Sequence, residues 1–430
     1  SDGDEGEGSL RQVISDSEEG DTITFSDSFT ITLGSPITID KDIVIDGGDK
    51  ITISGGEETT IFKITSGNVE IKNIFLKDGL SQGGNGQGPL GKGANRYYWD
   101  NEIESGPGGG GAGMGGALAI LKADVKLEGV SFINNKAIGG KGGYSKHSIG
   151  PWNGRDYDIY SGGGGGSIFS SGASRTPWAI NANGRNGGIG AGGGGSMAFY
   201  SNSTKGGVGG VGGGGGGGDG GVGVYSPGIG GSSKGFGGNG ADGSNSGQSG
   251  GGGGGAGLGG AIYIHEGSLT IKDSNFEANN AIGGVGGNTG ANDGGVGGNG
   301  QGVGGAIFVH KDAGITIDGT TFKNNSSDLS EEADDIYLNK SPGENFDFNK
   351  TSESFSVSSF LTVVEDTSSK LQKLKGALSQ SAPNQNGDLA AIIFGSGDNG
   401  IIKNDSVRIS DKAFIKMDNI GDLTFYPRSN

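Results

Sequence analysis

The sequence contains no cysteine, only 9 prolines and no long apolar run. Without cysteine, the chain has no disulfides and no thiolate ligands for a metal ion. The scarcity of proline, together with the lack of a strict Gly-X-Y period, excludes a collagen triple helix. No run approaches the roughly 18 apolar residues of a membrane-spanning helix. The sequence therefore predicts no transmembrane segment.

Basic residues are also few, with 31 Lys and Arg against 48 Asp and Glu and a formal net charge of −17. Binding to nucleic acid relies on Lys and Arg that displace counterions from phosphates. An anionic membrane surface attracts the same residues. The charge balance therefore argues against both as partners.

Glycine is the residue in excess, at 101 of 430 residues, against about 7% in an average protein. Hydrophobic residues make up only 31% of the chain, so its core is thin or confined to part of the sequence. An acidic, cysteine-free composition rich in Gly, Ser, Asn and Thr is typical of bacterial secreted surface proteins. We expect an extracellular or cell-surface protein whose signal peptide has been removed before Ser1.

A short sequence recurs along the chain, which is the signature of a repeat architecture. Residues 115–143 read GGALAILKADVKLEGVSFINNKAIGGKGG and align without a gap with residues 259–287, GGAIYIHEGSLTIKDSNFEANNAIGGVGG. A third copy spans residues 304–326, with one extra residue before Phe322, and a partial copy spans residues 68–79. Each copy is too small to bury an apolar face alone, so we expect the copies to stack.

Apolar residues alternate with polar ones inside each copy. In the copy that begins at Gly259, Ile262 and Ile264 share one predicted face, while Tyr263 and His265 take the other. A period of two predicts strands with one buried face. The spacing between strands is too short for crossover helices, so successive strands are expected to turn from face to face of a coil.

The chain divides into three predicted parts. Residues 1–20 form a solvated acidic tail and an N-terminal cap, with Leu10, Val13 and Ile14 at helical spacing behind Ser9 as N-cap. Residues 21–344 form the stacked repeats. Residues 345–430 form a β-rich segment that either finishes the stack or docks elsewhere, and Leu371, Leu374 and Leu378 in it share a helical face that could close the end.

These motifs resemble known bacterial surface proteins. The opening SLRQVI…GDTITF…ITIDKDIVIDG…ITISGG is similar to that of many right-handed parallel β-helix proteins. The pairs of GGA(I/L) and FxxN, for example Ala261-Ile262 with Phe276 and Asn279, resemble the repeat of polymorphic outer-membrane autotransporter passengers. The resemblance implies an all-β, right-handed, single-stranded parallel β-helix. The chain departs from that family in its longer glycine insertions and in lacking a C-terminal membrane barrel, which leaves the secretion route open.

Glycine-rich insertions interrupt the repeats at residues 80–113, 139–166, 184–195, 202–258 and 283–303. Where full copies flank them, they leave after FxxNxA and return before GGA, so a stack would send them all out from one edge. Two interpretations compete: flexible linkers, because glycine loses most entropy on ordering, or a lateral bundle of threefold polyglycine-II helices. The three-residue spacing of Ile282, Val285 and Asn288, and of Val208 and Val211, favours the bundle.

The insertions also hold most of the exposed candidates for binding. Aromatic and Arg residues are enriched at interfaces, and aromatic rings stack on sugars. The alternative is that these side chains do not bind a ligand and instead pack over the glycine layer as a small separate core. The candidates are Arg96, Tyr97, Tyr98, Trp99, Trp152, Arg155, Tyr157, Tyr160 and Trp178.

Metal sites are suggested only weakly. His265 and His310 occupy equivalent positions in consecutive copies, where they form either an exposed ladder or a two-ligand metal site. Residues 237–245, GGNGADGSN, nearly match the nonapeptide calcium repeat, with Asp242 at its acidic position. Of the two kinds of ion, the sequence favours calcium.

No catalytic cluster is recognisable in the sequence. Acid–base chemistry needs two groups with separated pKa values in one cleft, and Asp124, Asp273 and Asp318 are scattered over predicted turns. We expect a non-catalytic surface protein, either an adhesin or a self-assembling fibre or layer subunit, whose partners are further copies or other surface proteins. The alternative is a polysaccharide-binding or polysaccharide-cleaving β-helix protein.

Overall fold

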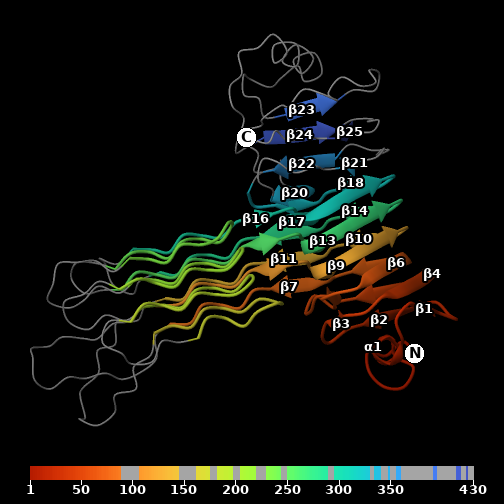
Figure 1. The fold of residues 1–430 in the computed structure, drawn as a ribbon, viewed down its shortest axis with the longest axis horizontal. Helices are drawn as coiled ribbons and strands as arrows, with labels where there is room; N and C mark the ends of the chain where they lie inside the picture. The colour runs from red at the N-terminus through yellow and green to blue at the C-terminus, as the bar shows by residue number, and fades with distance from the viewer. Residues whose placement is uncertain are drawn as a thin grey trace, which may run out of the picture.

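The computed structural model describes residues 1–88, 106–144, 161–174, 182–196, 204–218, 229–243, 249–288, 295–329 and 334–339, together with the strands β21–β25 beyond them. The described chain consists of β-strands, extended glycine-rich segments and one short helix (Figure 1). Its strands pair almost entirely in parallel, in curled sheets. The expected all-β, parallel architecture is confirmed at this level.

The N-terminal part begins with helix α1 (Leu10–Asp16) and continues with β1 (Asp21–Thr24), β2 (Phe29–Thr32), β3 (Ile37–Ile39), β4 (Ile43–Ser54), β5 (Phe62–Ile64), β6 (Asn68–Lys77) and β7 (Leu80–Gln82). The repeats that follow supply β8 (Gly113–Met114), β9 (Leu118–Glu128), β10 (Ser131–Ile133), β11 (Lys136–Ile138), β12 (Gly257–Leu258), β13 (Ile262–Lys272), β14 (Asn275–Glu277), β15 (Asn280–Ile282), β16 (Gly302–Val303), β17 (Ile307–Asp318), β18 (Thr321–Lys323) and β19 (Ser326–Ser327).

The sequence copies lie side by side in register. Leu118 of β9 pairs with Ile262 of β13, and Ile262 pairs with Ile307 of β17. The short strands form two further parallel sheets, one in the order β19-β15-β11-β7 and one in the order β16-β12-β8. Each copy therefore adds two strands to the largest sheet and one strand to the sheet of β7, β11, β15 and β19. This is how a stack of small units buries apolar surface that one unit cannot bury.

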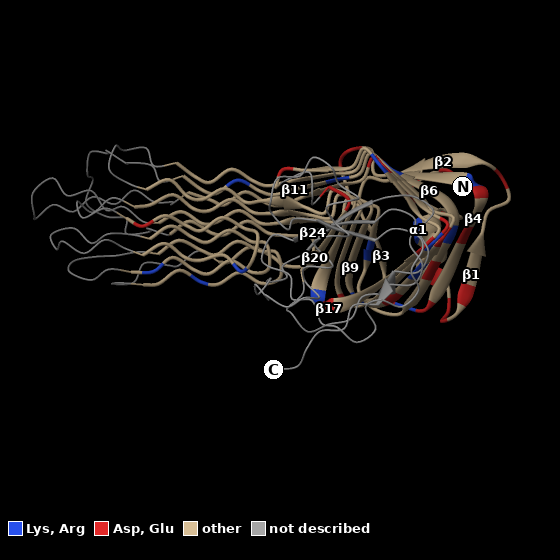
Figure 2. Cartoon of the chain, turned by 90° about the horizontal axis from the view of Figure 1, so that it is seen from above, with Lys and Arg blue, Asp and Glu red and all other residues tan. Residues whose placement is uncertain are grey.

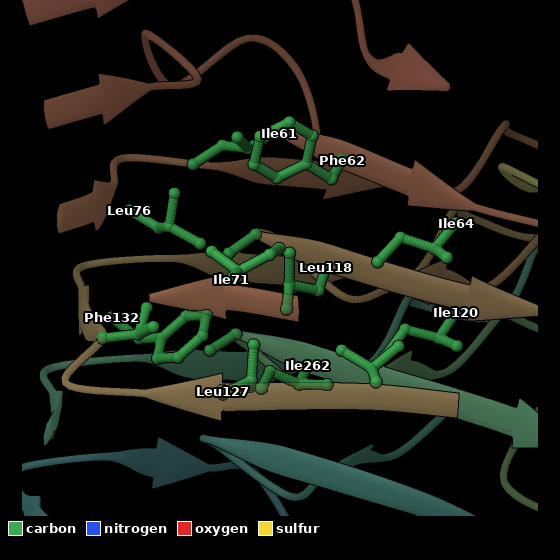
Figure 3. Close-up of a cluster of buried hydrophobic side chains, with 14 of the residues drawn as sticks. Ile61, Phe62, Ile64, Ile71, Leu76, Leu118, Ile120, Leu127, Phe132 and Ile262 are labelled. Carbon is green, nitrogen blue, oxygen red and sulfur yellow. The ribbon is translucent and has the colours of Figure 1, made fainter. Parts of the chain in front are cut away.

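The core lies between the curled sheets and follows the period of two. In β6 the residues Val69 and Ile71 are buried while their neighbours are partly exposed. Figure 3 shows side chains from successive strands, among them Phe62, Leu118 and Ile262, meeting in the interior. Burial of a side chain of this size contributes about 1.5–3 kcal/mol.

The FxxN motif builds two ladders, one apolar and one polar. The rings of Phe132 and Phe276 stack with centroids 4.6 Å apart, and those of Phe276 and Phe322 with centroids 4.9 Å apart. Three residues later, Asn135, Asn279 and Asn325 are buried at a turn. The recurring phenylalanine therefore fills the core of each copy, and the recurring asparagine satisfies polar groups beside it.

The asparagine ladder is continuous through hydrogen bonds. Asn279 Oδ1 accepts from the backbone N–H of Asn135 at 3.0 Å and from Asn135 Nδ2 at 2.9 Å. Asn279 Nδ2 donates to Phe132 O and to Asn325 Oδ1, each at 3.0 Å. One side chain thus satisfies backbone groups of the copy below and links to the copy above, which a buried turn requires.

The extra residue of the third copy lies in a β-bulge. Ile264 pairs with Val309, whereas Glu266 pairs with Asp312, so the register shifts at His265. A bulge takes up one additional residue without moving the strand on either side of it out of register with the stack. Leu269 and Ile271 accordingly pair with Ile315 and Ile317, and all four stay buried.

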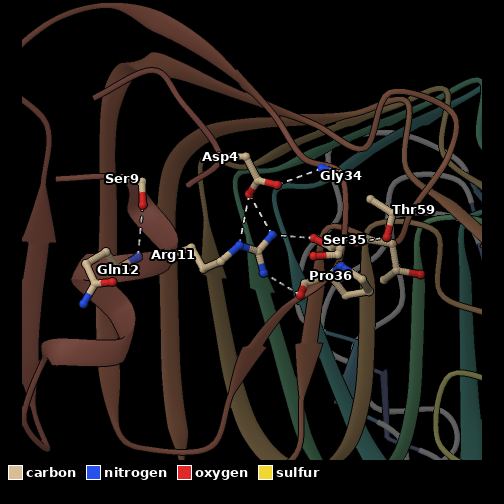
Figure 4. A network of polar contacts seen from close by, with 9 residues as sticks. Asp4, Ser9, Arg11, Gln12, Gly34, Ser35, Pro36 and Thr59 are labelled. Atoms are coloured by element: carbon tan, nitrogen blue, oxygen red, sulfur yellow. Dashed lines mark hydrogen bonds and ion pairs between the residues drawn. The ribbon is translucent and has the colours of Figure 1, made fainter. Parts of the chain in front are cut away.

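The N-terminal helix contributes to the same apolar core. Ser9 Oγ accepts from the N–H of Gln12 as an N-cap, and Leu10 and Ile14 are buried in the core. Arg11 bonds Asp4 through Nη2 at 2.7 Å and reaches the carbonyls of Ser35 and Pro36 (Figure 4). The expectation of a solvated acidic tail is therefore wrong for Asp4, and Val13, 38% exposed, does not belong to the buried face.

The remaining strands continue beyond the third copy. They are β20 (Ile336–Asn339), β21 (Asp347–Phe348), β22 (Phe355–Ser359), β23 (Ala391–Phe394), β24 (Ala413–Met417) and β25 (Leu423–Thr424). β20 extends the parallel stack on β17, and β22 on β20, whereas β22 pairs with β24 and β21 with β25 in the antiparallel direction. Leu371, Leu374 and Leu378 lie outside the described residues.

Candidate functional site: the glycine-rich segments

The glycine-rich tracts run away from the sheets and back again, side by side (Figure 1). The outward segments are residues 83–88, 139–144, 171–174, 191–196, 213–218, 237–243 and 283–288, and the returning segments are 106–112, 161–166, 182–188, 204–211, 229–234, 249–256 and 295–301. We refer to these segments together as the glycine bundle. Its charged residues are sparse compared with those of the sheets (Figure 2).

Backbone hydrogen bonds hold the glycine bundle together. Segment 106–112 shows the pattern most fully, because it bonds to neighbours on all sides. Gly109 N donates to Gly193 O and Gly110 N to Gly253 O, both at 2.8 Å. The same segment also bonds to residues 83–88, 139–144, 161–166 and 213–218. The described parts of the insertions are therefore mutually bonded, and glycine's conformational entropy is offset by bonds between segments.

Close approach of the segments requires glycine. A Cβ added to Gly109 would lie 2.1 Å from Gly214 O, and one added to Gly110 would lie 2.0 Å from Gly140 O. A Cβ on Gly111 would lie 2.0 Å from Gly166 O, on a third neighbour. Each successive residue thus faces the backbone of a different segment, so no side chain fits anywhere along this stretch.

The sequence of each segment matches its place in the glycine bundle. Residues 108–111 and 250–255 are unbroken glycine runs with neighbours on every side. Outer segments place a larger residue at every third position, as in residues 283–288, GGVGGN, where Val285 is 58% exposed. In residues 283–288, Gly284 and Gly287 are buried against neighbouring segments while Val285 and Asn288 are exposed, so the larger residues face outward at a three-residue spacing.

A second apolar cluster joins the glycine bundle to the sheets. Tyr263 of β13, Phe308 of β17 and Tyr337 of β20 stack on the outer side of the sheet, with centroids 5.5 and 5.7 Å apart. Phe236, from a turn between two glycine-rich segments, meets Phe308 and Tyr337 edge-on and is 1% exposed. The face that Tyr263 was expected to expose is therefore buried, because the glycine bundle folds back over it.

Further turns of the glycine bundle contribute to this junction. Ile168, Phe169 and Ile189 pack against the same cluster. These residues interrupt the glycine runs at the ends nearest the sheets. They fix the orientation of the glycine bundle relative to the sheets by apolar burial, which the glycine segments cannot supply themselves.

The far ends of the segments lie together at the other end of the glycine bundle (Figure 1). Hydrogen bonds between backbone N–H groups and carbonyls join the last described residues of different segments there: Gly106 to Ser196, Gly162 to Gly106, Gly217 to Pro107 and Gly250 to Gly218. The connecting sequences 89–105, 145–160, 175–181, 197–203, 219–228, 244–248 and 289–294 therefore all begin and end at this one place.

The aromatic and Arg residues singled out from the sequence fall in three of these connections. Arg96, Tyr97, Tyr98, Trp99, Trp152, Arg155, Tyr157, Tyr160 and Trp178 all lie outside the described residues. The described flanks nevertheless bring their three sequence stretches to one end of the glycine bundle. The sequence predicted that the insertions leave from one edge of the stack. Which segments bond to one another could not be predicted locally, because the bonded residues lie up to 143 positions apart, as Gly110 and Gly253 do.

His265 and His310 stack face to face, with ring centroids 4.2 Å apart. His310 is only 4% exposed, so the expected exposed ladder is wrong for that ring. The Tyr263 hydroxyl lies 2.9 Å from His265 Nδ1, and His310 Nδ1 donates to His265 O at 3.2 Å. Burial lowers the pKa of both imidazoles, that of His310 to about 4.

We expect the folded protein to lose stability in mild acid as His310 becomes protonated. Because the folded-state pKa of His310 is about 4 and its ordinary value is 6.5, its contribution is complete above pH 6.5 and declines as pH falls towards 4. We expect the free energy of unfolding in urea to drop by up to about 3 kcal/mol over that interval. The variant His310→Gln should flatten this pH dependence. An equal decline in wild type and variant would contradict the assignment to His310.

The candidate metal ligands have other partners in the structure. Asp242 Oδ1 accepts from the N–H of Gly230 at 2.7 Å, linking two outer segments of the glycine bundle. Among the described residues, no group of three His, Cys, Asp or Glu side chains is placed to hold a metal ion. The structure brings His265 and His310 together, but Asp242 is far from them in the glycine bundle.

Comparison with known proteins returned no relative. No family model, no curated protein and no solved structure matches the chain. In the part of the chain that the structure describes, no helix is long and apolar enough to cross a membrane.

Proposed function

We propose that the protein is a non-catalytic extracellular adhesin whose glycine bundle presents a binding surface at its far end. One observation carries the proposal: hydrogen bonds gather the flanks of seven connecting sequences, residues 89–105 to 289–294, at one end of the glycine bundle. Function resides disproportionately in loops held by a rigid scaffold. The mutual bonding of the glycine segments supplies such a scaffold.

The composition of those connecting sequences supports binding. They contain all three tryptophans of the chain, Trp99, Trp152 and Trp178, together with Arg96, Arg155 and several tyrosines. Trp, Tyr and Arg dominate binding energy at protein interfaces, and aromatic rings also stack on sugars. The ligand is thus a surface protein or a glycan of a neighbouring cell, and the aromatic content favours testing glycans first.

The architecture that fits this role is a right-handed parallel β-helix with a lateral polyglycine-II bundle. Parallel strands in curled sheets, copies in register and bonds between threefold glycine segments all support it. With this architecture the protein would be similar to the autotransporter passengers that its GGA(I/L)…FxxN pairs resemble. The stacked sheets would then act as the stalk, and the glycine bundle as the arm that carries the binding surface.

Tryptophan fluorescence tests the proposal directly, since every tryptophan lies in the connecting sequences. We expect the emission of the native protein to shift when it binds one of a panel of acidic and neutral polysaccharides or purified cell-surface proteins. The variant Trp152→Ala should weaken that binding roughly tenfold or more. Val285→Ala, on the exposed side of the glycine bundle, is the matched control and should bind as wild type.

Two results would count against an adhesin. Unchanged emission with every polysaccharide and protein would leave the connecting sequences without a ligand. Regular fibres or sheets of the purified protein under the electron microscope, with or without calcium, would instead favour a self-assembling subunit. The exposed aliphatic residues Val285 and Val296, 58% and 63% exposed, would then be the first contacts to mutate.

A further inference from the structure

Asn-Gly pairs recur in the outer segments of the glycine bundle. They are Asn85-Gly86, Asn183-Gly184, Asn186-Gly187, Asn239-Gly240 and Asn299-Gly300. Asn-Gly is ordinarily a signal for a tight turn. Here each pair lies inside a segment that runs alongside a neighbour, and each asparagine side chain bonds to that neighbour's backbone.

In three of the pairs, the asparagine and the glycine both bond to the backbone of one residue in the adjacent segment. We call this two-point contact a grip. Asn183 Oδ1 accepts from the N–H of Lys205 at 2.9 Å, while Gly184 N donates to the carbonyl of the same Lys205 at 2.8 Å. Three residues on, Asn186 Oδ1 and Gly187 N make the same two bonds to Val208, each at 2.9 Å. The threefold spacing on both segments keeps the two grips in phase.

The other pairs use the same two groups. Asn85 and Gly86 grip Lys141, at 2.9 and 2.7 Å. Asn239 and Asn299 lie beside antiparallel neighbours, and there the side chain and the following glycine N–H bond to residues two positions apart in that neighbour. In every pair, the asparagine Oδ1 and the N–H of the next glycine are both engaged.

The side-chain amide that carries Oδ1 and the backbone nitrogen of the next residue are the reactants of asparagine deamidation. In that reaction the backbone nitrogen of the following residue attacks the side-chain Cγ, a C–N bond forms, and the side-chain amide leaves as ammonia. Water then opens the resulting succinimide to aspartate or isoaspartate. Glycine in the following position makes the attack easiest, because it has no side chain to hinder it, and asparagine is accordingly among the thermolabile residues.

The grip opposes this attack on both sides. Attack requires the glycine nitrogen to approach Cγ in the correct orientation, and geometry of this kind governs the rate of intramolecular reactions. In the glycine bundle the nitrogen points its hydrogen at a neighbour's carbonyl, and the side chain is turned towards a neighbour's N–H. Both bonds to the neighbour have to break before the ring can close.

We propose that these five Asn-Gly pairs of the outer segments are latent deamidation sites that the folded glycine bundle locks, so that deamidation at them proceeds only when adjacent outer segments separate. The lock operates whatever ligand the protein binds. Its failure has a structural consequence. Aspartate is tolerated, since Asp242 accepts the N–H of Gly230 in the same way. Isoaspartate adds a carbon to the backbone and disrupts the threefold spacing.

Peptide mapping by mass spectrometry of the full chain tests the lock. The protein is incubated at mildly alkaline pH, native or unfolded in urea, and the gain of one mass unit is followed at each pair. We expect deamidation at these five sites to be slower in the native protein by roughly tenfold or more, because reaction requires local opening. Equal rates in the native and unfolded protein would overturn the proposal.

A proline substitution tests whether the bonds at one Asn-Gly pair slow its deamidation, independently of the protection that the fold gives to all of the pairs. Lys205→Pro removes the N–H that Asn183 holds and keeps the carbonyl that Gly184 holds, and the fixed φ of proline suits an extended threefold helix. We expect faster deamidation at Asn183, with Asn186 in the same molecule as the control. Val208→Pro should reverse the two sites. An unchanged rate at Asn183, or equal acceleration at both sites, would overturn the site-by-site lock.

Discussion

Replacing Gly110 by alanine is expected to unfold the glycine bundle locally while leaving the stacked sheets intact. The new Cβ would lie 2.0 Å from Gly140 O, 2.6 Å from Gly140 C and 2.8 Å from Lys141 O. Those atoms belong to the backbone of a neighbouring segment, so no side chain can rotate away to make room. Overpacking a core typically costs about 1–3 kcal/mol, and displacing a bonded backbone should exceed that range.

The consequence extends beyond segment 106–112 because that segment bonds to so many others. Moving it weakens its bonds with residues 139–144, 191–196 and 249–256. Hydrogen–deuterium exchange of the backbone amides measures this segment by segment. We expect Gly110→Ala to raise exchange throughout the glycine bundle, with little change in β9 and β13.

A glycine elsewhere in the chain supplies the matched control. A Cβ added to Gly314, in β17, meets nothing within 4 Å. Gly314→Ala should therefore be neutral, or stabilising by up to about 1 kcal/mol through reduced entropy of the unfolded chain. Similar exchange in the Gly110→Ala and Gly314→Ala variants would contradict the steric account of the glycine runs.

Replacing Asn279 by leucine is expected to have the largest effect on the stacked sheets. Leucine has nearly the shape of asparagine but neither accepts nor donates a hydrogen bond. The change would leave the N–H of Asn135, the carbonyl of Phe132 and the side chain of Asn325 each without one partner at a buried turn. Each buried polar group left unsatisfied costs about 1–3 kcal/mol, so we expect a loss of at least about 3 kcal/mol.

Urea unfolding followed by far-ultraviolet circular dichroism measures this loss. Asn275→Leu, in the same copy, is the matched control, since Asn275 is half-buried and its side chain accepts one bond, from Thr321 Oγ1 at 2.7 Å. Its loss should stay near or below about 1 kcal/mol. If the two variants lost equal stability, the ladder would have no special role in holding the copies together.

Much of the sheet architecture could be read from the sequence, because it rests on local periodicity. The alternation that begins at residue 262 placed Ile262 and Ile264 on one predicted face, and both are fully buried. The repeated FxxN marked positions that pair across copies, as Phe132 and Phe276 do. A side-chain period of two fixes which face a residue occupies before any tertiary contact exists.

The three-residue spacing in the sequence also indicated which stretches form the glycine segments. It did not indicate which of those segments lie inside the glycine bundle and which lie on its outside. Only the three-dimensional arrangement decides that residues 108–111 and 250–255 lie inside the glycine bundle and that residues such as Val285 face outward. In retrospect the unbroken runs carry that information, because only a segment surrounded by others excludes a side chain at every position.

Other features were decided by tertiary structure alone. Alternation placed Tyr263 on an outer face, yet Tyr263 is fully buried because Phe236 and its neighbours fold over it from the glycine bundle. The Asn-Gly pairs would be taken for turns, yet they lie in extended segments gripping Lys205 and Val208. The physical reason is the same for both: periodicity encodes a residue's own strand, whereas what covers that strand comes from residues distant in the chain.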